Sequence, residues 1–422
     1  MRNGLSALYD DVLLLDGVRT PWTDLGGALG QVSPTDLGIA VARALLARGH
    51  DAAAVDSMLA GSVAQASFDA YLLPRHIGLY AGVPEAVPAL QVQRVCGTGL
   101  ELLRQAGDQL QSGQASRVLC VAAESMTRNP IAAYTHRSGF RLGAPVEFHD
   151  FLWEALKDPA AGLDMLGTAE CLAQRHGIAR EDVDAWALRS FERALAAQRQ
   201  GWFREEIVPV AAVRFESAGL APRELRLPRG CALVDTDSHP RETSREALAR
   251  LVPVHPGGVQ TAGNSCAVVD GAAAVLLARG ADARARPALA WVRGSCVVGV
   301  LPALMGSGPV PAIQGLLDRA GLPLDAIDRL EINEAQGAQL LAVQRALELD
   351  PERLNVHGGS IALGHPLAAT GLRLAITLAR QLRAEGLRYG VAAVCIGGGQ
   401  GMAVLLENPG WRGRQGLGLG VT

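Results

Sequence analysis

The sequence predicts an α/β protein made of two related halves, each with the order strand–helix–strand–helix–strand, and a segment inserted between them. Short apolar runs alternate with longer amphipathic runs, as is typical of strands alternating with helices. An aspartate followed by a Thr-Gly-Leu motif occurs twice with one spacing, since 42 residues separate Asp56 from Thr98 and 42 separate Asp328 from Thr370. A more charged segment, from about residue 129 to 256, interrupts this order.

The elements are expected in the same order in both halves. We expect helices over 36–48 and 312–320, strands at Asp56 and Asp328, helices led by Thr98 and Thr370, and strands over 118–123 and 391–396. Such units favour a mostly parallel sheet with helices on its faces, and ligands bind at the carboxyl ends of its strands. Cys96 and His365 stand at such strand-to-helix junctions, one in each half, so both are expected at one cleft.

The inserted segment is expected to cover that cleft. Apolar positions at helical intervals predict a helix over 180–200, and Glu181 and Asp182 suit its amino end. The predicted domains are a first half over 1–128 with part of 257–285 returning to it, the insertion over 129–256, a second half over 286–408 and a flexible tail over 409–422.

Composition narrows the class of protein. A chain of 422 residues that is 49% hydrophobic can bury a core of two or three packed units. The formal charge of −3 gives no basic footprint for nucleic acid. Seven cysteines without paired spacing argue against a disulfide framework or a structural zinc site, so we expect reduced thiols, no metal and a cytoplasmic location. The longest uncharged span, 294–317, contains three prolines and predicts a strand and a loop instead of a membrane span.

Two residues carry the predicted nucleophilic chemistry. Cys96 lies in Arg-Val-Cys-Gly-Thr-Gly-Leu, where a helix amino terminus would lower the thiol pKa and stabilise the thiolate. His365 lies in a glycine-rich turn between Gly364 and Pro366, which would present the ring outward as a general base for the thiol. The structural alternatives are a buried packing cysteine and a surface histidine, and His357 is a weaker candidate for the base.

Three further motifs offer polar or reactive groups. Cys395 ends an apolar strand and precedes Gly397-Gly-Gly, whose N–H groups would hold an oxyanion, unless the glycines form only a turn. Asn333 follows the Asp328 strand and would hold a water or polarise a carbonyl, unless it only caps a helix. The stretch 261–266 supplies small polar groups, or is a simple turn.

Together these motifs resemble the thiolase family. The order is Cys-Gly-Thr-Gly-Leu, Asn-Glu-Ala, Gly-Gly-x-x-Ala-x-Gly-His-Pro and Cys-x-Gly-Gly-Gly, and the likeness runs from about residue 12 to 407. The resemblance implies a layered α/β/α/β/α core of two duplicated halves with an inserted loop domain. It also implies an acyltransferase that uses acyl-CoA as a substrate and holds no cofactor tightly.

The resemblance also implies a role for each site residue. Cys96 would be acylated, His365 would deprotonate it, and Cys395 would move the α-proton of the second acyl-CoA. One oxyanion site would be formed by His365 and a water on Asn333, and the other by the N–H groups of Cys96 and Gly397. The substrate would be bound around Met165, Ser265, Cys266 and Gln336.

Five positions differ from the usual family pattern, and all five lie near the expected substrate region. Gln336 stands where an aromatic is usual and Cys266 where a serine is usual, while the other three are Asp164, Ala368 and Gln93. The leading hypothesis is an active thiolase that forms a homodimer or homotetramer. The alternatives are a biosynthetic condensing enzyme with a carrier-bound acyl substrate and a non-catalytic lipid-binding protein.

Overall fold

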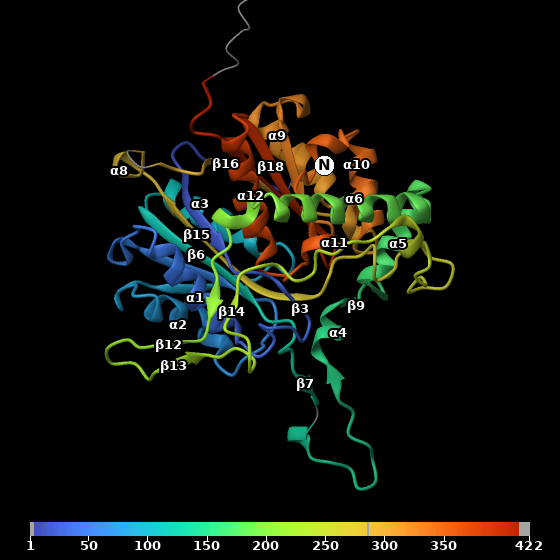
Figure 1. The fold of residues 1–422 in the computed structure, drawn as a ribbon, viewed down its shortest axis with the longest axis horizontal. Helices are drawn as coiled ribbons and strands as arrows, with labels where there is room; N and C mark the ends of the chain where they lie inside the picture. Colours follow the sequence, from blue (N-terminus) through green and yellow to red (C-terminus); the bar gives the residue numbers. More distant parts are fainter. Residues whose placement is uncertain (1–3, 135, 285–286, 413–422) are drawn as a thin grey trace, which may run out of the picture.

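The protein is described here from a computed structural model that covers residues 4–134, 136–284 and 287–412. Most of the predicted tail over 409–422 therefore lies outside the described residues. Eleven strands form one sheet, in the order β17-β18-β19-β16-β2-β15-β6-β4-β5, with β1 on β16 and β3 on β15 (Figure 1). The sheet has two parts, one from each half of the chain, which meet where β2 pairs with β16 over two residues.

The first half contributes the blue and cyan part of Figure 1. Its elements are β1 (Leu5–Leu8), β2 (Leu13–Arg19), β3 (Thr23–Asp24), α1 (Pro34–Leu46), β4 (Ser57–Gly61), α2 (Leu73–Tyr80), β5 (Ala89–Gln91), α3 (Thr98–Gln111) and β6 (Arg117–Glu124). After the insertion, β15 (Val269–Ala278) returns to this half and pairs with both β2 and β6. The short helix α8 (Ala281–Arg284) follows it.

The second half repeats this order in orange and red. Its elements are β16 (Ala290–Gly299), the 3₁₀ segment η5 (Pro302–Ser307), α9 (Pro309–Ala320), β17 (Arg329–Ile332), α10 (Gly337–Ala346), α11 (Ser360–Leu363), α12 (Thr370–Ala384), β18 (Tyr389–Ile396) and β19 (Gln400–Glu407). The predicted helices and strands of both halves are thereby confirmed. The expected loop within 294–317 was wrong, because η5 and the start of α9 occupy it.

The duplication is visible in matching contacts. Asp56 accepts hydrogen bonds from the backbone N–H groups of Ser116 and Arg117 at the start of β6. Asp328 accepts them from Arg388 and Tyr389 at the start of β18. Each repeated aspartate thus fixes the strand that follows the central helix of its half. The repeat marks a shared structural frame.

The sheet is mixed, and the expectation of a mostly parallel sheet was wrong. Parallel pairing is limited to β4 with β5 and β6, and to β17 with β18. Strands β15 and β19 are each the last strand of their half, and both run antiparallel to the strands beside them. Antiparallel neighbours therefore hold the middle of the sheet together.

Three buried clusters give the molecule its layers. One lies between the two parts of the sheet and contains the apolar faces of α3 and α12. A second lies under α1 and α2, and the third under α9 and α10. The two central helices cross so closely that a Cβ on Gly371 would lie 2.4 Å from the Leu100 nitrogen. Glycine is required at this crossing, which brings the helix amino ends of both halves together.

The segment from 129 to 256 lies outside the central sheet. It contains α4 (Phe151–Ala155), α5 (Met165–His176), α6 (Arg180–Arg199), α7 (Arg245–Ala249) and four two-stranded pairs formed by β7 (Ile131–Ala132) with β8 (His149–Asp150), β9 (Lys157–Asp158) with β10 (Leu163–Asp164), β11 (Val210–Ala211) with β14 (Leu233–Val234), and β12 (Val213–Phe215) with β13 (Arg223–Leu225). The helix predicted over 180–200 is confirmed as α6. The part around β7 and β8 projects away from the body (Figure 1).

A buried ion-pair cluster fastens the insertion to the first half. The Arg19 guanidinium donates to Glu206 at 2.8 Å and to both carboxylate oxygens of Asp237 at 2.6 and 2.8 Å. All three side chains are buried, so each charge is compensated by a hydrogen-bonded partner. No helix of the described residues has the length and apolarity to cross a membrane.

Candidate active site

Cys96 lies two residues before the start of α3 and lines a cavity of about 230 Å³. The cavity is lined by Val95, Cys96, Ala155, Leu156, Lys157, Asp158, Pro159, Met165, Leu367, Gly397 and Gly398. The thiol is reached from the cavity, although Cys96 is only 9% exposed. Val95 has a φ of 44°, which is uncommon for a β-branched residue and marks a backbone held under strain beside the thiol.

Burial decides the ionisation of Cys96. It raises the pKa of the thiol to about 11, which overturns the expectation that the helix amino end lowers it. The backbone N–H groups of Gly397 and of Cys96 itself bond the sulfur and lower the pKa, but they offset only part of the desolvation. The nearby Glu124 carboxylate raises it further. At neutral pH Cys96 is a thiol that needs a base.

His365 is buried, at 3% exposed, so the expectation of an outward-facing ring was wrong. Its backbone N–H donates to the Ala267 carbonyl at 2.9 Å, which holds the loop against the chain entering β15. Gly364, with a φ of 94°, lies so close to Val269 that a Cβ would be 2.5 Å from the valine side chain. Packing from the first half of the sheet therefore turns the ring inward.

The hydrogen bonds of His365 assign its tautomer. Nδ1 lies 2.6 Å from Thr370 Oγ1, and that hydroxyl donates to the Pro366 carbonyl at 3.2 Å. Nδ1 therefore carries the proton and donates to Thr370, which leaves Nε2 unprotonated and able to act as an acceptor. Burial and then the charge of Arg373 lower the pKa of His365 to about 3. The resting ring is neutral and can take a proton at Nε2.

Asn333 faces the same nitrogen. Its Nδ2 lies 3.4 Å from His365 Nε2, and its Oδ1 accepts a 2.7 Å hydrogen bond from Ser360. The amide is thus fixed with its N–H₂ group toward the histidine. His357, the weaker candidate for the base, lies elsewhere. It stacks on Trp202 and bonds Gln381 at 2.9 Å.

Cys395 is fully buried near the end of β18 and packs with Met305, Ala335 and Met165. Burial, and next the neighbouring Cys96 and Cys266 thiols, raise its pKa well above the ordinary value. The glycines after it form the turn into β19, with positive φ at Gly398 and Gly399. The alternative that the glycines form a turn is therefore confirmed, and this turn also directs the Gly397 N–H at the Cys96 sulfur. That these N–H groups hold an oxyanion stays a prediction.

The predicted substrate-binding residues divide into two groups. Met165 lines the cavity at Cys96. Ser265 and Gln336 pair with each other across a backbone bridge and are absent from that lining. Among the described residues, the Ser265 hydroxyl and the Gln336 side-chain carbonyl have no hydrogen-bond partner. Cys266 is partly buried, its backbone N–H donates to the Ala335 carbonyl, and desolvation followed by the Cys96 thiol raises its pKa.

Two buried glutamates position the site and were missed from the sequence. Glu124 accepts hydrogen bonds from Ser62, Val63 and Ala64 of the first half, and from the Ala368 N–H in the His365 loop of the second half. It ties the two halves together beside Cys96. The signal for it was an acidic residue at the end of an otherwise apolar strand.

Glu334, next to Asn333, fixes helix α6 of the inserted segment against the second half. Its carboxylate accepts from the Trp186 indole and the Ser190 hydroxyl of α6, at 3.0 and 2.7 Å. It also accepts from Asn355 and from the Ile361 N–H of α11. Within the described ranges, no three histidine, cysteine or acidic side chains are grouped as metal ligands would be.

Comparison with known proteins places this site in a family. Sequence models of the thiolase N-terminal domain and C-terminal domain match residues 12–281 and 286–408. The chain belongs to the thiolase family. The match to the N-terminal domain extends across the segment 129–256, so in thiolases that segment is part of the domain.

Full-length relatives agree with this assignment. The chain is 40% identical over 407 residues to bovine (Bos taurus) mitochondrial 3-ketoacyl-CoA thiolase, covering 95% of this chain and 99% of the relative. It is 41% identical over 406 residues to a probable acetyl-CoA acetyltransferase of Escherichia coli, covering 94% and 99%. The crystal structure of human mitochondrial 3-ketoacyl-CoA thiolase in complex with CoA has a TM-score of 0.89 and 39% identity, covering 96% of this chain and 100% of that one. The expected duplicated, layered thiolase fold is confirmed.

Proposed function

We propose that the protein is a thiolase that transfers an acyl group between CoA thioesters through an acyl-enzyme on Cys96. The observation that carries the proposal is the set of groups brought together at this cavity. A thiol bonded by the Gly397 N–H lines it, and the loop of Leu367, another lining residue, carries a neutral histidine whose Nδ1 is held by Thr370 and whose Nε2 faces the Asn333 amide. These are the parts that nucleophilic acyl transfer needs.

The first half-reaction acylates Cys96. His365 Nε2 takes the thiol proton, and the sulfur attacks the carbonyl carbon of the thioester. The developing oxyanion is stabilised by N–H donors, for which the backbone of Gly397 and Cys96 and the Asn333 amide are the candidates. The C–S bond to CoA then breaks, and the proton on His365 leaves with the CoA thiolate. The acyl group remains on Cys96.

The second half-reaction forms or breaks a carbon–carbon bond. Cys395 first passes its thiol proton to His365, and the thiolate then takes an α-proton from a second acyl-CoA. The resulting carbanion attacks the acyl carbon on Cys96, the S–C bond breaks, the Cys96 thiolate takes back the proton held by His365, and a 3-ketoacyl-CoA leaves. The reverse sequence is thiolytic cleavage. The fully buried Cys395 beside Met165 suits a base that must be shielded from water.

The direct test is to incubate the protein with acetoacetyl-CoA and CoA and follow the loss of enolate absorbance. We expect turnover, and the same assay with longer and branched 3-ketoacyl-CoA gives the chain-length preference. Lack of activity with all of them would contradict the proposal. A second arm offers acyl groups on a carrier protein, and charging from that carrier alone would favour the condensing-enzyme alternative.

The nucleophile has its own test. Acetyl-CoA should leave an acetyl mass increment on Cys96, and Cys96→Ser should abolish the thioester adduct. Cys120→Ser, at a buried thiol of β6 outside the cavity, is the matched control and should keep it. An adduct that moved to Cys395 or Cys266 would show that the nucleophile was assigned wrongly.

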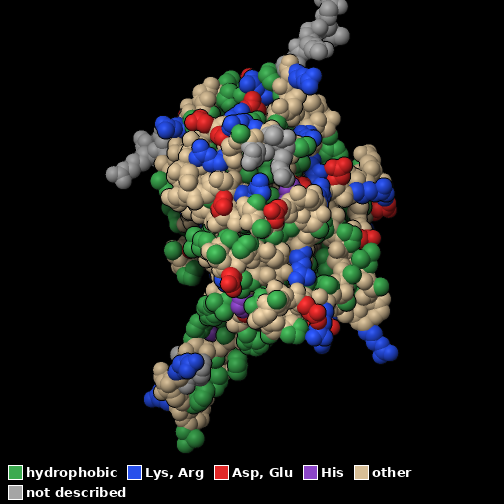
Figure 2. All heavy atoms as spheres, turned by 90° about the vertical axis from the view of Figure 1, so that its left-hand side faces the viewer, with side chains coloured by type: hydrophobic (Ala, Val, Ile, Leu, Met, Phe, Trp, Pro, Cys, Tyr) green, Lys and Arg blue, Asp and Glu red, His purple; other side chains and the backbone are tan. Residues whose placement is uncertain are grey.

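We also propose that the chain forms a homodimer or homotetramer. The edge strand β5 leaves Leu90 exposed, and the projecting segment exposes Tyr134, Phe140, Leu142 and Phe148. Figure 2 shows this projection as a largely hydrophobic arm. Light scattering at micromolar concentration tests the oligomer, and a monomer would contradict it. The cytoplasmic location stays a prediction, which cell fractionation tests.

A further inference from the structure

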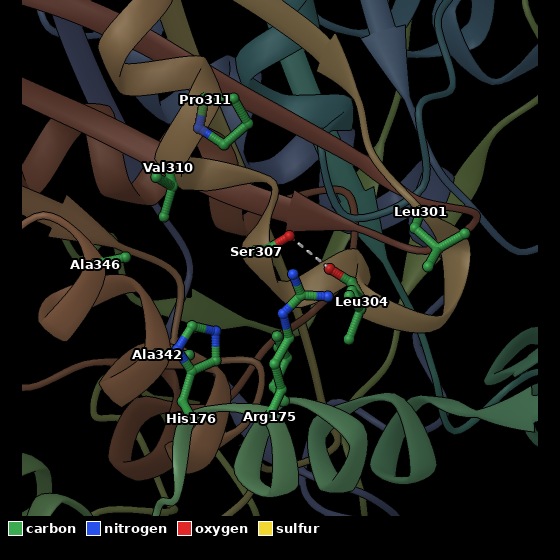
Figure 3. Close-up of a pocket in the computed structure, with 10 residues that line it drawn as sticks. Arg175, His176, Leu301, Leu304, Ser307, Val310, Pro311, Ala342 and Ala346 are labelled. Carbon is green, nitrogen blue, oxygen red and sulfur yellow. Dashed lines mark hydrogen bonds between the residues drawn. The ribbon is translucent and has the colours of Figure 1, made fainter.

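A second cavity, separate from the one at Cys96, lies among α5, η5, α9 and α10 (Figure 3). Its volume is about 440 Å³, within the range of roughly 300–1,000 Å³ that small-molecule sites occupy. Apolar side chains form most of its wall, among them Leu172, Leu304 and Val310. Nothing in the proposed reaction uses this cavity.

The polar groups of the cavity are concentrated at the end of one helix. Arg175 and His176 are the last two residues of α5, and Figure 3 shows Arg175 extending toward η5 and His176 extending toward Ala342 of α10. No aspartate or glutamate is among the lining residues. Within the described ranges Arg175 has no carboxylate partner, whereas the neighbouring Arg345 is paired with Asp182 at 2.7 Å. Arg175 is exposed, so its unpaired guanidinium stands at the rim of the cavity, and an apolar wall with such a rim suits an amphiphile whose anionic head stays at the surface.

The wall between this cavity and the catalytic one is thin. In η5, Leu304 lines the second cavity, while the next residue, Met305, packs against Cys395. The helix α5 likewise runs from Met165 in the catalytic cavity to Arg175 in the second. Tight contacts hold η5, since a Cβ on Gly306 would lie 2.6 Å from Leu172 and from Gln339. A ligand that displaces Leu304 therefore acts on the segment that packs on Cys395.

We propose that this second cavity binds an unbranched fatty-acid anion, its carboxylate on Arg175 and its chain against Leu172, Leu304 and Val310, and that η5 transmits occupancy to Cys395. The carboxylate is chosen because Arg presents paired donors that match its two oxygens. The unbranched chain is chosen because the remaining wall offers only apolar contacts. Filling the site is expected to slow the step that uses Cys395.

Binding is tested first and directly, by calorimetric titration of decanoate into the intact protein with its catalytic cavity occupied by saturating CoA. We expect one saturable site, with decanol of the same chain length binding at least tenfold more weakly. Arg175→Glu should weaken decanoate by tenfold or more, while Arg383→Glu, at an exposed arginine in the last turn of α12, should leave it unchanged. No saturable binding, or equal binding of acid and alcohol, would overturn the proposal.

Two further outcomes separate a ligand site from a structural role. Arg175 and His176 also suit the carboxyl end of a helix dipole. If Arg175→Glu lowers the melting temperature but leaves decanoate affinity unchanged, the pair is structural and the proposal fails. Leu304→Trp should fill the cavity, abolish decanoate binding and slow α-proton exchange of acetyl-CoA without slowing acetylation of Cys96. Equal slowing of both steps would overturn the link through η5.

Discussion

The loop before α3 and the loop before α12 occupy equivalent places, 272 residues apart, and differ in what they hold. Cys96 in the first loop corresponds to Ala368 in the second, and His365 in the second corresponds to Gln93 in the first. The threonines that begin both helices also differ in use. Thr98 Oγ1 accepts from the Arg94 N–H, whereas Thr370 Oγ1 bonds the His365 ring.

This difference shows how a symmetric frame supports an asymmetric site. Backbone positions, aspartate contacts and the glycines at the helix crossing recur in both halves. The reactive groups occur once each, the nucleophile in one loop and the base in the other. Because the crossing of α3 and α12 brings the two loops together, neither half holds a complete site.

Removing the base from the second half has the largest expected effect. His365→Asn leaves the Cys96 thiol without a proton acceptor, so acylation by acetyl-CoA should slow by about 10²–10⁴-fold. Gln93→Asn introduces the same residue at the equivalent, exposed position of the first half and should be near wild type. Rapid-quench mass spectrometry of the acyl-enzyme measures both. Equal losses would mean that the two loops do not differ as described.

The crossing itself is tested by Gly371→Ala. The added Cβ would meet the backbone of Gly99 and Leu100, which cannot move aside, so unfolding free energy should fall by about 3 kcal/mol or more. Gly78→Ala in α2 is the control, because its Cβ would be 3.5 Å from the nearest atom, on Met58. That variant should be neutral or slightly stabilising. Denaturant titration compares the two, and similar stabilities would argue against a tight crossing.

The next largest effect is expected from changing Glu124, whose hydrogen bonds join the two halves. Glu124→Gln turns one oxygen into an N–H₂ group that faces existing donors, either Ser62 and Ala64 or Val63 and Ala368. We expect a loss of about 2 kcal/mol in stability. The pKa of Cys96 should also fall, since the carboxylate raises it. An unchanged thiol titration would show that Glu124 only supports the fold.

The smallest effects are expected from removing the two repeated aspartates, one in each half. Asp56→Ala and Asp328→Ala each remove two backbone hydrogen bonds at the start of β6 or β18, at a cost of about 1–2 kcal/mol. Both should lower stability by similar amounts and leave the acylation rate of folded protein unchanged. A large difference between the two variants would contradict the equivalence of the frame.

Local sequence patterns predicted the frame because its contacts are local. The repeated aspartates, the helices led by Thr98 and Thr370 and the strand before Cys395 all follow from spacing and periodicity. The ionisation of the site did not follow, because burial arises from long-range packing. The ring of His365 turns inward through contacts with residues 267–269, and the Cys96 thiol is desolvated by segments from both halves and the insertion.

The central claim is that both reactive groups rest neutral and that a proton passes between the halves when substrate binds. Alkylation of Cys96 by iodoacetamide, followed by peptide mass mapping from pH 6 to 11, tests it most directly. With a thiol pKa of about 11 and a His365 pKa of about 3, the rate should keep rising about tenfold per pH unit beyond pH 9. A rate that levels off near pH 7 would reveal a resting thiolate and contradict the claim.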